Sequence, residues 1–181
     1  MKYFLFLLLS TIYITIGYSQ KNNTETGPVF DRFGGVYAID EADLLLDAEK
    51  NYKVIFDIYT DEKKASVMNP LINTIARFMN MHAQNGLPED QMDVVVVLHG
   101  TATRNALNKK AFKKEFKAKH PNAELITELV QKNVKVYVCG QSMKSKGYES
   151  KDISADVKIS LSALTALVKY QYEGYQLINF N

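Results

Sequence analysis

The chain has a single cysteine, and the residues around it could make its thiol reactive. Segment 134–138 alternates valine with lysine and tyrosine, which predicts a short strand ending at Cys139. Gly140 breaks this strand, and the polar Gln141 and Ser142 can open a helix. Helix-terminal N–H groups and the positive end of the helix dipole favour a thiolate at such a junction. Cys139 is therefore the catalytic candidate, with Gly140, Gln141 and Ser142 as candidate binding residues.

Two kinds of basic side chain could act on this thiol. Lys144 and Lys146 could supply positive charge one or two turns along the expected helix. His99 ends another predicted strand and could reach the same sheet edge, where a Cys–His pair would activate the thiol. A hydrogen bond from His99 to a loop is an equally open alternative. His82 is interpreted as a core or interface histidine, and His120 as a loop residue.

The beginning of the chain has the features of a cleaved signal peptide over residues 1–19. Lys2 precedes an apolar run over 3–16, and Gly17 and Ser19 place small residues where a signal peptidase reads them. The run is shorter than a bilayer span, so a membrane anchor is the weaker alternative. We expect cleavage before Gln20, a periplasmic or otherwise exported protein, and no membrane association afterwards.

A lone cysteine in an exported protein leaves two interpretations open. Secreted proteins usually pair their cysteines, and one cysteine cannot form an internal disulfide. Cys139 is then either a free thiol with a function or a small buried apolar side chain that only packs.

The elements that must position these residues predict an α/β protein. Strands are expected over 52–59, 94–98, 134–138, 156–161 and 175–180, and helices over 69–85, 111–119, about 125–130, 141–146 and 162–173. This alternation predicts a three-layer α/β/α sandwich with a mostly parallel sheet of about five strands. Residues 20–51 form an N-terminal extension, and 52–181 a single domain.

Two apolar groups stand out in this framework. Leu44, Leu45 and Leu46 lie in an acidic stretch of the extension and are expected to pack onto the domain or a neighbouring subunit. The helix predicted over 162–173 has one stripe at helical spacing that starts just before it and comprises Leu161, Leu164, Thr165, Val168 and Tyr172.

Charge and motif content exclude several classes of function. The 181 residues carry a net charge of only +2, so no whole-molecule field favours nucleic acid. Six lysines between 109 and 119 could attract phosphate or an acidic partner, although a solvated helix face is the favoured interpretation. The chain has no phosphate loop, dinucleotide fingerprint or paired-cysteine motif, so no cofactor and no metal are predicted.

Four segments together resemble the DsrE/DsrF-like family over about residues 52–180. They are the runs 94–100, 121–126 and 136–142, and the ending from Ala163 to Tyr175. Segments 27–30 and 42–43 resemble the N-terminal extension of an exported branch of that family. The resemblance implies a three-layer α/β/α fold, trimers or hexamers, and a persulfide-carrying cysteine just after a strand, a position that Cys139 matches.

The expected function is therefore that of an exported DsrE-like protein that handles sulfur through Cys139. Its expected partners are further copies of itself and a sulfur donor or acceptor protein or a small sulfur species. Two alternatives remain open from the sequence: a non-catalytic oligomeric binding module with a structural cysteine, and a thiol redox sensor.

Overall fold

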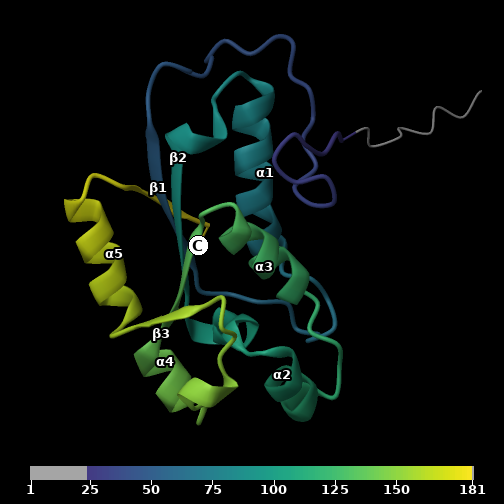
Figure 1. Cartoon of the computed structure of the whole chain (residues 1–181), viewed down its shortest axis with the longest axis vertical. Helices are drawn as coiled ribbons and strands as arrows, with labels where there is room; N and C mark the ends of the chain where they lie inside the picture. Colours follow the sequence, from purple (N-terminus) through teal and green to yellow (C-terminus); the bar gives the residue numbers. More distant parts are fainter. Residues whose placement is uncertain (1–23, 181) are drawn as a thin grey trace, which may run out of the picture.

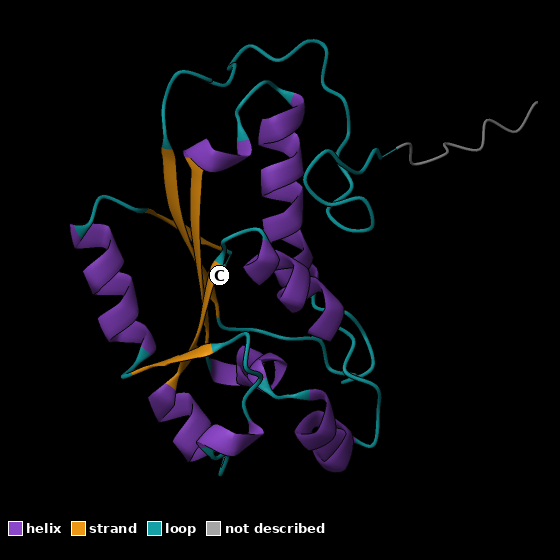
Figure 2. Ribbon diagram, in the orientation of Figure 1, coloured by secondary structure: helices purple, strands orange, loops and turns teal. Residues whose placement is uncertain are grey.

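The computed structural model describes residues 24–180 and shows a sheet with helices on both faces (Figures 1 and 2). The strands all run parallel in the order β4-β3-β2-β1-β5. They are β1 (Tyr52–Ile58), β2 (Met92–Leu98), β3 (Lys135–Cys139), β4 (Lys158–Ser160) and β5 (Gln176–Asn179). The predicted three-layer fold is confirmed, and the sheet is wholly rather than mostly parallel. The predicted signal peptide lies outside the described residues.

Five α-helices and three 3₁₀ turns connect the strands. The helices are α1 (Pro70–Gln84), α2 (Lys109–Phe116), α3 (Ala123–Gln131), α4 (Gly140–Ser145) and α5 (Ala163–Tyr172), and the 3₁₀ turns are η1 (Glu89–Gln91), η2 (Gly100–Ala106) and η3 (Ser150–Asp152). The helix predicted over 111–119 begins two residues earlier, because the Asn108 side chain accepts a hydrogen bond from the Ala111 N–H. It also ends earlier, because Lys117 adopts a left-handed conformation with φ 54°.

The strand order decides which helices cover which face. From β1 to β4 the chain steps across the sheet in one direction, and it then returns to place β5 beside β1. Parallel crossovers are right-handed, so the returning helix must lie on the opposite face from the helices before it. Accordingly α1 and α3 lie on one side of the sheet and α5 on the other (Figure 1). The α5 layer is a single helix.

The two faces carry cores of unequal size. The face under α1 and α3 buries the larger cluster, which includes Phe56 and Leu98. Strand residues alternate between faces, so Ile55 and Val97 point to the other side and pack against α5. Cys139 belongs to this smaller cluster, together with Ala163, Ala166, Tyr170 and Tyr175 of α5 and the turn after it.

The outward face of α5 carries the apolar stripe that the sequence shows. Ala163, Ala166 and Tyr170 face the sheet. The opposite side of the helix therefore leaves Leu164, Val168 and Tyr172 exposed, with fractions of 77%, 52% and 88%, and Leu161, just before the helix, adds a fourth at 73%. Two alanines and one tyrosine thus form the face of α5 that packs on the sheet.

The N-terminal segment is fastened to α1 by one buried side chain. The Asn80 carboxamide accepts hydrogen bonds from the N–H groups of Val29 (3.1 Å) and Phe30 (2.8 Å), and donates to three backbone carbonyls of residues 30–34. Of the leucines expected to pack, Leu46 contacts the larger core. Leu44 and Leu45 stay exposed on this chain. No helix within residues 24–180 has the length and hydrophobicity needed to cross a bilayer.

Candidate functional site

The carboxyl ends of three neighbouring strands bring together Asp57, His99 and Cys139. Asp57 is the last residue but one of β1, His99 follows β2, and Cys139 ends β3. The β1–β2 and β2–β3 registers align these strand ends. In a parallel α/β sheet this edge is the usual place for a ligand or for chemistry. The structure therefore confirms the predicted strand-to-helix junction at Cys139.

Hydrogen-bond donors from two helices converge on the sulfur of Cys139. Cys139 is the N-cap of α4, and its Sγ accepts a hydrogen bond from the Ser142 N–H at 3.4 Å. The N–H groups of Gln141 in α4 and Ala163 in α5 also interact with it, as does the Ser142 hydroxyl. The Ser142 Oγ in turn accepts a hydrogen bond from the Gly100 N–H at 3.3 Å, which ties the site to the end of β2.

These donors shift the thiol toward its charged form. Burial alone raises the pKa of Cys139, but the hydrogen bonds from Ser142, Ala163 and Gln141 together outweigh it and hold the pKa below its ordinary value. Lys144 and Lys146, the predicted sources of positive charge, are exposed side chains. The groups that lower the pKa of Cys139 are therefore N–H and hydroxyl donors, and not the lysines predicted from the sequence.

The thiol is covered as well as polarised. Cys139 is only 5% exposed and packs in the α5 core. The chain between β4 and α5 passes directly over the junction, because a Cβ added to Gly140 would lie 2.7 Å from the Ser160 carbonyl oxygen. The Gln141 side chain also donates to the Leu161 carbonyl at 3.4 Å. Gly140 and Gln141, predicted as binding residues, thus hold the connection 160–162 against the site.

We expect the alkylation of Cys139 to show a lower pH midpoint in the folded protein than in urea. In the unfolded state the thiol has a pKa of about 8.5. In the folded state the hydrogen-bond donors favour the thiolate and lower that pKa. Folding stability linked to this group is accordingly present above the unfolded pKa and is lost as the pH falls through the folded pKa. Iodoacetamide rates measured against pH in both states test this.

Ser142→Ala serves as the control for that measurement. It keeps the thiol but removes one donor, so its folded midpoint should move back toward the unfolded value. A wild-type folded midpoint at or above the unfolded one would show that burial, not hydrogen bonding, controls the thiol.

His99 is bonded to a carboxylate rather than to the cysteine or to a loop. Its Nε2 lies 2.6 Å from Asp57 Oδ1, and Asn179 donates to the other carboxylate oxygen at 3.4 Å. The ring also packs edge-on against Tyr59 at 5.0 Å between centroids. Within residues 24–180 no hydrogen bond joins His99 to Cys139. The two residues are linked only through the Gly100 N–H and the Ser142 hydroxyl.

Asp57 is the residue of this site that sequence reasoning missed. It is 7% exposed and interrupts the apolar, buried run 54–58 of β1. A single carboxylate in such a strand requires a polar partner, because burying an unpaired charge is costly. That interruption was the available signal, and His99, directly after the neighbouring strand β2, is the partner.

The other two histidines are placed away from the thiol. His82 is half-buried on α1, where its ring contacts Tyr52 and Phe78, in line with the interpretation as a core histidine. His120 does lie in a loop, but it is 4% exposed, bonded to the Asn105 carbonyl and stacked on Phe112. Burial lowers the pKa of His120, which favours the neutral form of its ring.

No metal centre competes with the thiol as a candidate site. In the described part of the chain no group of three or more histidine, cysteine or acidic side chains is arranged to hold a metal ion.

Two solved structures share the fold of this protein. A protein of unknown function, MTH1491 from Methanobacterium thermoautotrophicum, matches with a TM-score of 0.54 and 20% identity, over 71% of this chain and 99% of its own. The ychN protein from E. coli matches with a TM-score of 0.52 and 16% identity, over the same shares. At these identities the likeness concerns the fold.

The family follows from the sequence match. The profile of the DsrE/DsrF-like family matches residues 53–180, and the chain belongs to that family. This confirms the family that the four segments resemble. No curated protein matches the chain.

Proposed function

We propose that this protein carries sulfur as a persulfide on Cys139. The observation that supports the proposal is the convergence of N–H groups from α4 and α5, with the Ser142 hydroxyl, on a single sulfur atom. A sulfur carrier needs a thiolate, and N–H and hydroxyl donors stabilise one without a metal or a neighbouring cation. Membership of a family associated with sulfur relay supports the same activity.

The transfer step is a thiol–persulfide exchange. The Cys139 thiolate attacks the outer sulfur of a donor persulfide, RS–SH, with its lone pair. An Sγ–S bond forms, the donor S–S bond breaks, and its electron pair leaves with the donor as the thiolate RS⁻. In the unloading step, an acceptor thiolate attacks the outer sulfur of the Cys139 persulfide, the Sγ–S bond breaks, and Cys139 leaves as the thiolate. No external oxidant or reductant is consumed.

Access to the thiol requires movement within the connection 160–162. This segment covers the junction. Ser160, the last residue of β4, is held by its pairing with Cys139 and by the hydrogen bond from its hydroxyl to the Val138 carbonyl. The movable part is therefore Leu161 and Ser162, to which α4 contributes the Gln141–Leu161 bond. Leu161 is itself 73% exposed, so its displacement uncovers little new apolar surface. In this proposal the covered state protects the persulfide from solvent, and contact with a donor or acceptor opens it.

A second candidate is a binding module in which Cys139 only packs. Its supporting observation is the 5% exposure of Cys139 within the α5 core cluster. A sulfur carrier takes up sulfane sulfur on its thiol, whereas a binding module does not. In a redox sensor, the thiol would instead be oxidised and gain oxygen. Intact mass after exposure to polysulfide separates all three.

Export belongs to the same proposal. The sequence features of residues 1–19 support secretion, and N-terminal sequencing of the mature protein should begin at or near Gln20. Recovery of the chain with Met1 and the apolar run intact would reject it.

We expect the protein to form a homo-trimer or homo-hexamer through the outer face of α5. The four exposed side chains of that stripe, three on α5 and Leu161 just before it, are large and apolar, which marks an interaction surface. Light scattering should give a trimeric or hexameric mass for the wild type and a monomeric mass for Leu164→Glu.

Met81→Glu is the matched control for this assembly test. Met81 is also a partly exposed apolar residue on a helix, but it lies on α1, across the sheet from α5. It should leave the mass unchanged. A monomeric wild type, or equal dissociation by both variants, would contradict the α5 interface.

A further inference from the structure

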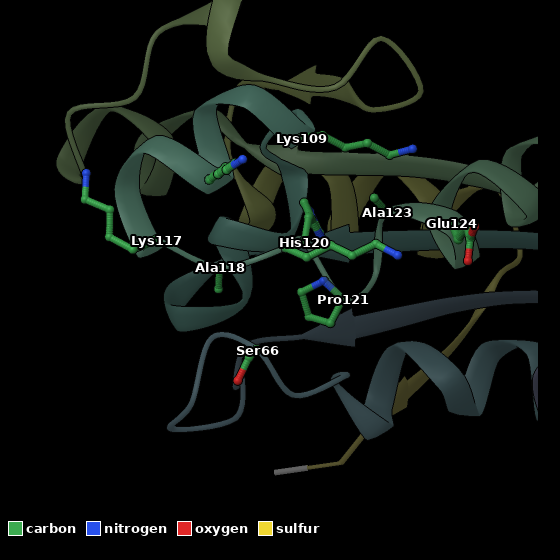
Figure 3. A pocket seen from close by; sticks show the side chains of 10 residues that line it. Ser66, Lys109, Lys117, Ala118, His120, Pro121, Ala123 and Glu124 are labelled. Carbon is green, nitrogen blue, oxygen red and sulfur yellow. The ribbon is translucent and has the colours of Figure 1, made fainter.

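A cavity of about 610 Å³ lies beside the start of α3, away from the α5 face that holds Cys139. It opens between α2, α3 and the loop that carries Ser66, with His120 and Pro121 at its centre (Figure 3). This volume falls within the range of about 300–1,000 Å³ typical of small-ligand pockets. Four of its lining side chains are lysines: Lys109, Lys113, Lys117 and Lys119.

The positive charge around this cavity is not neutralised within the described chain. None of the four lysines forms an ion pair with a carboxylate in residues 24–180. Lys117 donates instead to the Lys114 carbonyl at 2.7 Å. The acidic residue in the lining, Glu124, lies 3.5 Å from Arg32. The cavity therefore has an excess of uncompensated ammonium groups.

The start of α3 adds hydrogen-bond donors to the same cavity. Asn122 precedes this nine-residue helix but makes no side-chain cap. Its carboxamide is used elsewhere, because Oδ1 accepts from the Asn69 N–H and Nδ2 donates to Asn105. The first turn, with Ala123 in the cavity wall, thus presents N–H groups without a side-chain acceptor. Helix N-termini of this kind bind phosphate and sulfate groups.

A second hollow of about 410 Å³ continues the first. The two share Lys109, His120 and Ala123, and the second adds Lys110. It also includes Asp156, whose carboxylate accepts a hydrogen bond from the Thr127 hydroxyl. The combined space exceeds what one phosphate or sulfate ion fills. Its occupant must therefore carry several anionic groups to reach lysines on both sides.

We infer that this cavity binds a small polyanion that carries several phosphate or sulfate groups. The site uses neither Cys139 nor the α5 face, so it is independent of the proposed sulfur chemistry. It also revises the favoured interpretation of the lysine cluster as a merely solvated helix face, because four of its lysines line one hollow instead of spreading around α2.

The test is calorimetric titration of the folded protein with two probes at low ionic strength. Inorganic tripolyphosphate represents the phosphate source, and sucrose octasulfate the sulfate source. The variant Lys113→Gln/Lys119→Gln removes two lining charges. Its control is Lys114→Gln/Lys158→Gln, which removes two exposed lysines that line neither hollow. Circular dichroism verifies that both variants are folded.

We expect at least one probe to bind the wild type and the control with the same affinity. The cavity variant should bind it about tenfold more weakly or worse, because it loses two charge-assisted hydrogen bonds. The tighter probe identifies the anionic group. The inference is overturned if neither probe binds the wild type, or if the control variant loses as much affinity as the cavity variant.

Discussion

Cys139→Ser should abolish the uptake of sulfane sulfur by this protein. Wild-type protein exposed to polysulfide should gain the mass of one sulfur atom, because Cys139 is the only cysteine in the chain and its thiolate is stabilised. Serine can still cap α4 but offers no sulfur nucleophile. Intact mass spectrometry, with recovery of the original mass after reduction, measures the difference, and the expected effect is complete loss.

Ser145→Ala is the matched control for this experiment. Ser145 lies on the same short helix, is exposed, and is not among the groups that interact with the thiol. The control should load sulfur as the wild type does. If the wild type gains no sulfur while its thiol alkylates normally, the carrier function fails and the packing role of Cys139 remains. A gain of oxygen alone would instead favour redox sensing.

Asn80→Ala should be the most destabilising single substitution of a polar residue in this fold. Asn80 is fully buried, and its removal takes the side-chain partner from two N–H groups and from the carbonyls of Phe33 and Gly34. The Phe30 carbonyl, which it also contacts, keeps a hydrogen bond from the Gly27 N–H. Each buried group left unsatisfied costs about 1–3 kcal/mol, so a loss of roughly 3 kcal/mol or more in unfolding free energy is expected. Urea denaturation followed by circular dichroism measures it.

Asn73→Ala is the control. Asn73 also lies on α1 and also bonds the N-terminal segment, but through a single hydrogen bond. The Asn73 carboxamide accepts a single hydrogen bond, from the Gly34 N–H at 3.0 Å, and the residue is only partly buried. Its loss should be about 1 kcal/mol. Equal losses for the two variants would mean that water satisfies the backbone of residues 29–34 and that Asn80 does not fasten the segment. Limited proteolysis should cut that segment first in Asn80→Ala.

Local patterns in the sequence determined the elements and the position of the thiol. Alternating valines ending at Cys139, followed by Gly140, are enough to predict a strand, its end and the helix after it. In the same way, the pair Asn69-Pro70 predicts the start of α1, and the periodic apolar residues that follow predict the helix itself. These predictions succeed because side-chain periodicity and capping depend on neighbours within a few residues.

The direction in which α5 faces could not be derived from its own residues. Its large apolar side chains predict a helix but not which side meets the sheet. The chain returns across the sheet in a right-handed crossover, and packing on the sheet then buries Ala163, Ala166 and Tyr170. Leu164 and Tyr172 are consequently turned outward, where only assembly with another surface could bury them.

Tertiary structure also decided which hydrogen-bond donors surround the thiol, because they come from separate segments of the sequence. The sequence places Ser142 next to Cys139, but the Ala163 N–H reaches the sulfur only because β4 pairs with β3 and brings the start of α5 to the same edge. The Asp57–His99 contact likewise depends on the register between β1 and β2. Local sequence determines what each element is, whereas strand order, register and crossover handedness determine which distant groups meet.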